Sequence, residues 1–134
     1  MTDGALTFRA LRHANLGRLK FWGYDNGIDD WSLSDWAVAT AGELGEACNI
    51  IKKLNRAHDG LRGNTESEGD LQAALAGELA DTIIYLDLLA ARAGIDLGDA
   101  VIDKFNLVSE RLAFPRHVRL APDEPARPPG GAAA

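Results

Sequence analysis

The sequence predicts an all-α fold, an antiparallel helical bundle of four main helices that assembles into an oligomer. Apolar residues recur at three- and four-residue intervals over long stretches, which is the period of an amphipathic helix. No stretch alternates between apolar and polar residues as a half-buried strand would. A length of 134 residues suits a single domain with one core.

The first two helices are placed by their apolar pattern and by the residues that interrupt it. The first is expected over residues 5–22 and is broken by the glycine-containing run 23–27. Ser32 and Asp35 then form a capping-box pattern, in which each side chain bonds to the backbone N–H of the other residue. This pattern predicts a second helix from there to about Asn55.

The third and fourth helices follow a polar, glycine-rich stretch. Residues 57–70 have almost no apolar content, so they are expected to form a flexible loop. A third helix should begin near Leu71 and end at Gly94, because glycine readily takes the left-handed conformation that closes a helix. Asp96 and Asp99 repeat the capping pattern and open a fourth helix. We expect that helix to continue through about Leu112.

Composition limits the domain organisation and the class of partner. Residues 1–114 are expected to form the helical domain, whereas residues 115–134, rich in Pro, Gly and Ala, should form a mobile tail. The net charge of −6 argues against a nucleic-acid surface. The most apolar stretch, 71–93, is interrupted by acidic residues, so we expect no membrane span and a cytoplasmic protein. The single cysteine, Cys48, is expected to be a small buried hydrophobic residue.

Two pairs of acidic residues are the main candidates for chemistry. Glu43 and Glu46 in the second helix, and Glu78 and Asp81 in the third, are spaced so that each pair shares one helical face. The flanking residues are apolar, which predicts that both helices are buried around much of their circumference. Carboxylates in such surroundings need a positive partner. Ligand sets made only of oxygen favour Mg²⁺ or Mn²⁺ over zinc or copper.

The connection between the second and third helices should bring the acid pairs together. Antiparallel packing is the simplest arrangement of two consecutive helices. At a rise of ~1.5 Å per residue, the pairs lie roughly 14 and 10 Å from the hairpin end, and therefore at similar height. The sequence thus predicts four carboxylates around one divalent cation, with aromatic residues nearby.

Several motifs follow one another in a characteristic order. They are Trp36–Lys53 with Gly-Glu-Leu-Gly-Glu-Ala at its centre, Glu78–Tyr85, Ile95–Leu97 and Lys104–Arg111. In this order they resemble the MazG-like members of the all-α nucleoside triphosphate pyrophosphohydrolases, whose relatives include dCTP pyrophosphatases and dimeric dUTPases. The resemblance spans about residues 8–112. One departure is that the segment between the acid motifs is slightly longer than is usual in the family, with the excess in residues 57–70.

The resemblance implies Mg²⁺-dependent hydrolysis of a nucleoside triphosphate to the monophosphate and pyrophosphate, in a role such as cleansing of the nucleotide pool. It implies that the catalytic and metal-binding residues are Glu43, Glu46, Glu78 and Asp81, with Mn²⁺ as an alternative ion. The candidate substrate-binding residues are Trp22, Trp31 and Trp36 for the base, Tyr85 for the sugar, and Lys53, Lys104, Asn106 and Arg111 for the phosphates. Which carboxylate accepts the proton of the attacking water stays open.

Other interpretations of these residues remain. Tryptophans pack in cores more often than they stack on ligands, Lys53 could be an ordinary surface lysine, and a basic residue near a helix end is also explained by the helix dipole. The alternative functions are a non-catalytic helical interaction module and a specialist of the dUTPase or dCTPase type. A redox carboxylate bundle is disfavoured, because no histidine follows any of the acids at the spacing of di-iron proteins.

The helices carry more apolar surface than one chain of this size can bury. Such surfaces favour self-association, and relatives in the family form dimers or tetramers. We therefore expect a homotetramer or a homodimer.

Overall fold

The computed structural model describes residues 4–122, and every regular element in this range is helical. The main helices are α1 (Phe8–Leu19), α2 (Leu33–His58), α3 (Glu68–Arg92) and α4 (Leu97–Arg111). Short 3-10 helices lie at Lys20–Trp22, Gly27–Asp30 and Arg116–Val118. The predicted all-α class with four main helices is confirmed.

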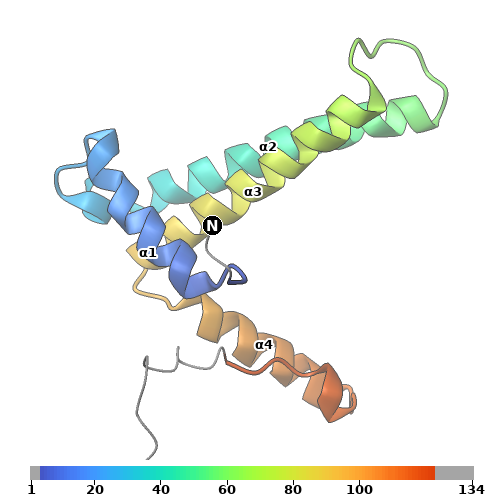
Figure 1. Ribbon diagram of the computed structural model, residues 1–134. Coiled ribbons are helices and arrows are strands. Elements are labelled where there is room, and N and C mark those ends of the chain that lie inside the picture. Colours follow the sequence, from blue (N-terminus) through green and yellow to red (C-terminus); the bar gives the residue numbers. More distant parts are fainter. Residues whose placement is uncertain (1–3, 123–134) are drawn as a thin grey trace, which may run out of the picture.

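The long hairpin of α2 and α3 dominates the structure (Figure 1). The two helices run antiparallel and side by side over most of their length, and a loop joins them at one end. α1 lies across the other end of the hairpin, where α2 begins and α3 ends. α4 leads away from that end instead of packing along the hairpin. One chain therefore covers only part of the surface of α2 and α3.

The start of α2 is fixed by the predicted capping box. The Ser32 hydroxyl accepts from the backbone N–H of Asp35 at 3.2 Å, and the Asp35 carboxylate accepts from the backbone N–H of Ser32 at 2.9 Å. The other end of α2 reaches His58 and so passes the expected limit of Asn55. The helix therefore takes in residues whose composition had suggested a loop.

The start of α3 also lies outside the expected range. Ser67 caps this helix by accepting from the backbone N–H of Asp70 at 3.1 Å, so the helix begins at Glu68 and not near Leu71. The loop between α2 and α3 is thus residues 59–67, which is shorter than predicted.

The turn between α3 and α4 agrees with the sequence prediction. Gly94 has a φ of 70°, the left-handed conformation expected after the helix, and the Asp96 side chain accepts from the backbone N–H of Asp99 at 3.0 Å. A Cβ atom on Gly98 would lie 3.2 Å from the Cβ of Phe8, so this turn also brings α4 close to the start of α1.

The core lies where α1 crosses the hairpin. Leu19, Trp36 and Leu88 are each at most 1% exposed and come from α1, α2 and α3. Trp31 packs on Trp36 with ring centroids 4.6 Å apart, and the Trp36 indole N–H donates to the carbonyl of Ile28 at 3.2 Å. The segment between α1 and α2 is therefore part of the core.

Asp87 on α3 is a buried acid, only 1% exposed. Its carboxylate accepts from Arg12 Nε at 2.9 Å and from Asn15 Nδ2 at 2.9 Å. Arg12 also donates to the backbone carbonyl of Ile95 at 3.0 Å. A buried carboxylate is tolerated when it is paired and hydrogen-bonded, and these bonds join α1 to α3 and to the turn before α4.

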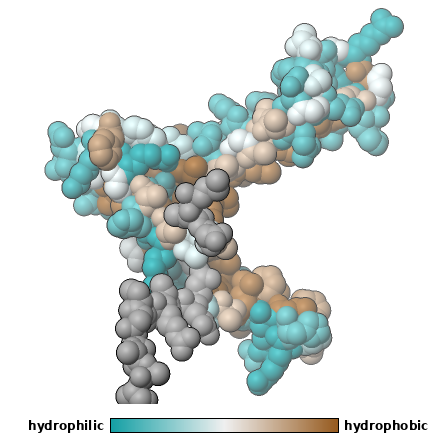
Figure 2. All heavy atoms as spheres, in the orientation of Figure 1, coloured by the Kyte–Doolittle hydropathy of each residue, from teal (hydrophilic) through white to brown (hydrophobic). Residues whose placement is uncertain are grey.

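The prediction that α2 and α3 are buried around much of their circumference is wrong for a single chain. Val38 is 71% exposed, and Leu44, Leu79 and Ile83 are between 44% and 49% exposed. The physical reason is that, within residues 4–122, α1 and the segment joining it to α2 cover one end of the hairpin and leave much of the rest uncovered. Cys48 is exposed as well, contrary to expectation, because it lies on an uncovered face of α2. Figure 2 shows hydrophobic residues at the surface over the hairpin and over α4.

The first part of the segment expected to be a mobile tail makes defined contacts. The Asn106 side chain donates to the Leu120 carbonyl at 2.8 Å and accepts from the Leu120 N–H at 2.9 Å. The remainder of that segment, residues 123–134, lies outside the described residues. Within residues 4–122, no helix is both long enough and apolar enough to cross a membrane.

Candidate metal and nucleotide site

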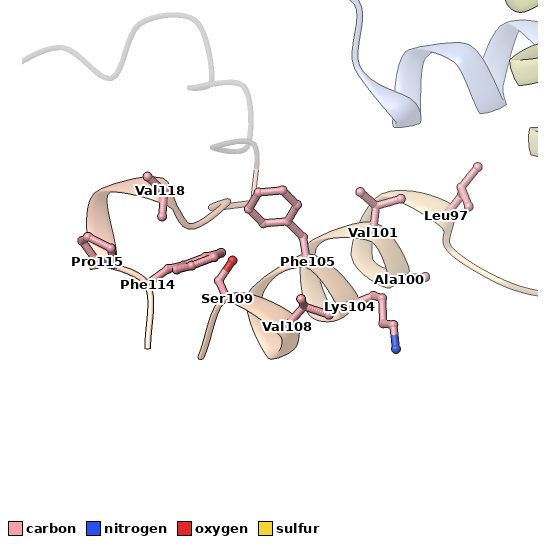
Figure 3. A pocket seen from close by; sticks show the side chains of 10 residues that line it. All are labelled: Leu97, Ala100, Val101, Lys104, Phe105, Val108, Ser109, Phe114, Pro115 and Val118. Carbon is pink, nitrogen blue, oxygen red and sulfur yellow. The ribbon is translucent and has the colours of Figure 1, made fainter. Parts of the chain in front are cut away.

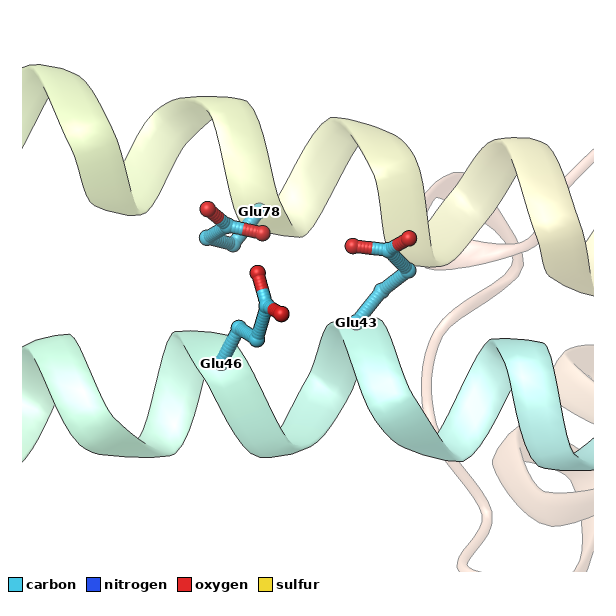
Figure 4. Close-up of side chains that lie close together, drawn as sticks. All are labelled: Glu43, Glu46 and Glu78. Atoms are coloured by element: carbon cyan, nitrogen blue, oxygen red, sulfur yellow. The ribbon is translucent and has the colours of Figure 1, made fainter.

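Three carboxylates meet between α2 and α3. Glu43 and Glu46 on α2 and Glu78 on α3 each offer an oxygen atom, and these atoms all lie within 4.8 Å of one another. Figure 4 shows the three side chains turned toward one another from facing turns of the two helices. The hairpin therefore brings the two acid motifs to the same height, as their distances from its end predict. Asp81, one turn after Glu78, is exposed and lies outside this close group.

The cluster is electrostatically unfavourable without a cation. Loss of solvation raises the pKa of Glu78, and the neighbouring negative charges of Glu46, Glu43 and Asp81 raise it further. Within residues 4–122, no lysine or arginine forms an ion pair with any of these acids. The negative charge is therefore left for something from outside the chain to neutralise.

The donor set fits a hard divalent cation. Carboxylate oxygens are the ligands that Mg²⁺ and Mn²⁺ prefer in proteins, whereas zinc and copper sites usually contain nitrogen or sulfur. Glu43 and Glu78 are partly buried and Glu46 is exposed, so a phosphate group could approach from the solvent side of Glu46. This arrangement can hold a metal ion where a phosphorylated substrate can reach it.

The aromatic residues on either side of the acids differ in accessibility. Trp36 is buried, and its ring centroid lies 6.3 Å from that of Tyr85. Tyr85 is partly buried, and its pKa is raised first by loss of solvation and then by the charge of Glu43. Within one chain, Trp36 supports the position of Tyr85 and has no open ring face for a base.

Trp22 is the accessible member of the predicted base-binding group. Its side chain is 49% exposed, and the Cζ atom of Arg18 lies 4.4 Å from the centre of its ring. Trp31, in contrast, packs against Tyr24 and Trp36 in the core. Of the three tryptophans, Trp22 alone has the surface exposure that stacking on a base requires.

Lys53 is already engaged within the chain. Its ammonium group pairs with the carboxylate of Glu66 in the loop between α2 and α3. The hydrogen bond from Lys53 lowers the pKa of Glu66 to about 2. The Asn64 side chain donates to the Lys53 carbonyl at 2.7 Å, which ties the same loop to the end of α2. The structure thus gives Lys53 a role at the loop.

Part of this chain is similar to curated nucleotide-hydrolysing enzymes. Over 81 residues it is 36% identical to dCTP pyrophosphatase 1 of Homo sapiens, and over the same length 37% identical to that of Rattus norvegicus. The bovine protein of the same name, from Bos taurus, is 35% identical. The predicted family resemblance is confirmed. Each match covers 60% of this chain and 45% of the relative, so the chain matches less than half the length of these relatives. No family model matches the chain.

The remaining candidate substrate-binding residues lie on α4. Lys104 lines an open, largely apolar groove of about 890 Å³ between α4 and the segment that follows it (Figure 3). Asn106 is bonded to Leu120, and Arg111 is the last residue of the helix. Because α4 leads away from the hairpin, the chain does not bring these residues to its own carboxylates.

Arg18 is the residue near Tyr85 that sequence reasoning missed. Its charge acts on Tyr85, where it opposes the rise in pKa caused by burial and by the acids. Nothing in the local sequence of α1 marks Arg18, because its position depends on how α1 crosses α3. The only signal available was its spacing from Trp22, which suits a contact along one helical face.

Proposed function

We propose that this chain is a nucleoside triphosphate pyrophosphohydrolase, converting a nucleoside triphosphate and water to the monophosphate and pyrophosphate with Mg²⁺. The observation that carries the proposal is the group of Glu43, Glu46 and Glu78, which face one another across the hairpin and have no basic residue of the described range 4–122 paired to them. The names of the similar enzymes, dCTP pyrophosphatases, support the same chemistry.

The metal-binding residues would be Glu43, Glu46 and Glu78, with Asp81 as the outer member of the set. When bound, Mg²⁺ would neutralise charge on the phosphate oxygens, which hydrolysis at phosphorus requires; Mn²⁺ could replace it. Because these carboxylates stand on two packed helices, the hairpin would orient a bound ion and the substrate phosphates. One carboxylate of the set would accept the proton of the attacking water.

The substrate would be a deoxyribonucleoside triphosphate such as dCTP. The similar enzymes are named for that nucleotide. Tyr85 lies next to the acids and is held by Trp36, so its ring is fixed where a sugar would pack and could disfavour a ribose 2′-hydroxyl. Trp22 supplies the exposed ring for the base. A substrate of this kind fits a cytoplasmic enzyme that controls or cleanses the nucleotide pool.

The working form would be a homodimer or a homotetramer. Exposed apolar residues on α2 and α3, and the open groove on α4, form larger apolar surfaces than a monomer usually leaves in water. Packing of α4 against the hairpin of another chain would cover both surfaces. It would also carry Lys104 and Arg111 toward a set of carboxylates. Light scattering that gives the monomer mass of 14.4 kDa would contradict this assembly.

A nucleotide panel tests the activity directly. The eight common ribo- and deoxyribonucleoside triphosphates and dUTP would be incubated with the protein and Mg²⁺, and released pyrophosphate measured. We expect turnover that is highest for a deoxyribonucleotide, is abolished by EDTA and is lost in Glu46→Gln. Glu68→Gln, an exposed acid on α3 away from the cluster, is the matched control and should keep full activity. Absence of turnover on every nucleotide would favour a non-catalytic interaction module.

A further inference from the structure

Arg18 is an exposed cation that no carboxylate of residues 4–122 neutralises. Its side chain is held in two ways. The guanidinium lies over Trp22 at 4.4 Å from the ring centre, and one N–H donates to the Asn15 side chain at 3.4 Å. A guanidinium carries five N–H donors in a planar fork, so most of them remain free to bind an oxygen from outside the chain.

The part of α1 that carries Arg18 is fixed against α3. Asn15, one turn earlier, donates to the Ile84 carbonyl at 3.2 Å and to the Asp87 carboxylate at 2.9 Å. Leu19, the next residue, is fully buried in the core. The backbone around Arg18 is therefore held on both sides, and a ligand would meet an arginine that is already in place.

The fixed position brings Arg18 close to Tyr85, at the end of the hairpin that α1 crosses. Tyr85 follows Ile84, packs against the same core as Leu19, and is close enough to Arg18 for the guanidinium to oppose the rise in its pKa. The acids Glu43 and Asp81 act on the same tyrosine. Arg18 and these acids thus all lie close enough to Tyr85 to influence its hydroxyl group.

A triphosphate needs positive charge in addition to the metal, and the basic residues that the sequence suggested are poorly placed to supply it. Lys53 is paired with Glu66, while Lys104 and Arg111 lie on α4, which leads away from the hairpin. Arg18 is held near Tyr85 and forms no ion pair within residues 4–122. Arginine also matches phosphate geometry better than lysine, because its planar fork can form two parallel hydrogen bonds.

We propose that Arg18, held on Trp22, binds a phosphate oxygen of the nucleoside triphosphate from the same chain that supplies the carboxylates. This inference rests on the proposed function and adds a binding residue to that site. Arg18 would help to orient the phosphates relative to the carboxylates, while Trp22 remains available to the base through the ring face that Arg18 does not cover.

The test compares Arg18→Gln with Arg9→Gln, an exposed arginine on the same helix. Binding would be measured by calorimetry in Mg²⁺ with an α,β-imido deoxyribonucleoside triphosphate, which resists cleavage at the reacting bond. Loss of a charged hydrogen bond predicts a Kd about 10- to 100-fold weaker for Arg18→Gln. Arg9→Gln should stay within about twofold of wild type, and Arg18→Lys should recover part of the affinity because charge is kept while the fork is lost.

Inorganic tripolyphosphate separates a phosphate contact from a base contact. It contains no base, so its affinity should fall in Arg18→Gln by a similar factor. Weakened nucleotide binding with unchanged tripolyphosphate binding would assign Arg18 to the base and overturn the proposal. An unchanged nucleotide Kd would overturn it as well. Thermal unfolding of each variant shows whether α1 stays packed on α3.

Turnover separates this inference from the proposed function. A wild-type protein that binds the imido nucleotide but releases no pyrophosphate from any triphosphate would contradict the enzymatic proposal. The Kd values of wild type and Arg18→Gln would still show whether Arg18 contacts a phosphate. If wild type does release pyrophosphate, Arg18→Gln should raise KM by more than it lowers kcat, since the contact is made before the reacting bond changes. A merely structural role would lower stability and leave KM in place.

Discussion

Glu78 and Asp87 are two acids on the same helix. Asp87 is surrounded by hydrogen-bond donors, whereas Glu78 is surrounded by other acids. Asp87 is buried and accepts hydrogen bonds from Arg12 and Asn15. Glu78 is less buried, yet its closest charged neighbours are acids, which contribute to the rise in its pKa. A buried carboxylate whose charge is matched within the fold is needed there, because its loss would leave its buried partners unpaired. One whose charge is not matched is a candidate for binding a ligand.

The largest effect should come from removing the unmatched charge. Glu78→Gln should lower kcat/KM by about 10³-fold, equivalent to about 4 kcal/mol of transition-state stabilisation, because a metal ligand is lost. Its stability without metal should not fall, since repulsion from Glu46 and Glu43 is relieved. Pyrophosphate release and urea unfolding in EDTA measure the two quantities. A variant that unfolds more easily than wild type would contradict this account of Glu78.

Substitution of Asp87, whose charge is matched, should lower stability and leave metal binding intact. Asp87→Ala leaves Arg12 and Asn15 without their shared acceptor and should lower the free energy of unfolding by about 3 kcal/mol, the lower end of the range for breaking a buried pair because Arg12 is partly exposed. Urea unfolding provides the measurement. Any protein that remains folded should still bind Mg²⁺, because the carboxylate cluster is intact. A change below about 0.5 kcal/mol would show that the pair does not hold α1.

Metal binding should remove the repulsion at Glu78 and stabilise the folded state. A ligand that binds only the folded state stabilises it by about 2.7 kcal/mol at one hundred times its Kd. Thermal unfolding with increasing Mg²⁺ should show a rising Tm in wild type and a much smaller rise in Glu46→Gln. An equal rise in Tm in the two proteins would show that the ion binds elsewhere.

Glu78 should make the metal-free protein less stable as pH rises, which is unusual for an acidic residue. Its pKa is higher in the folded state than its ordinary value of 4.5, so the folded state binds the proton more tightly than the unfolded state does. This group therefore favours folding at low pH, and its contribution is lost as pH rises from that ordinary value through the raised one. Urea unfolding in EDTA across this range should show a slope that Glu78→Gln reduces. An unchanged slope would exclude Glu78 as its source.

The smallest effect is expected at Lys53. Its partner Glu66 is exposed, and exposed ion pairs contribute about 0–1 kcal/mol, so Lys53→Gln should lower the free energy of unfolding only slightly. If Lys53 also contacts phosphate, KM should rise beyond what the stability change explains. Steady-state kinetics on the best nucleotide would measure this difference.

The sequence predicted the features that depend on local pattern. Ser32 and Asp35 mark the start of α2 because a capping box needs only neighbouring residues, and Glu43 and Glu78 meet because hairpin geometry follows from helix length. The same local signal at Ser67 and Asp70 was available but overlooked, since the polar composition around it resembles a loop.

The features that the sequence did not reveal depend on where helices cross. Asp87 is buried because α1 lies against that face of α3, and Cys48 is exposed because no part of residues 4–122 covers its face of α2. Arg18 approaches Tyr85 for the same reason. The apolar pattern shows that a helix has a face to bury, but it does not show which neighbour buries it.

The mutual hydrogen bonds between Asn106 and Leu120 have a practical consequence for anyone who shortens this protein. Cutting after residue 114, where the composition changes, would leave the amide of Asn106 without its backbone partners. It would also remove Pro115 and Val118, which line the α4 groove. A trimmed version intended for crystallisation should therefore keep the chain at least through residue 120.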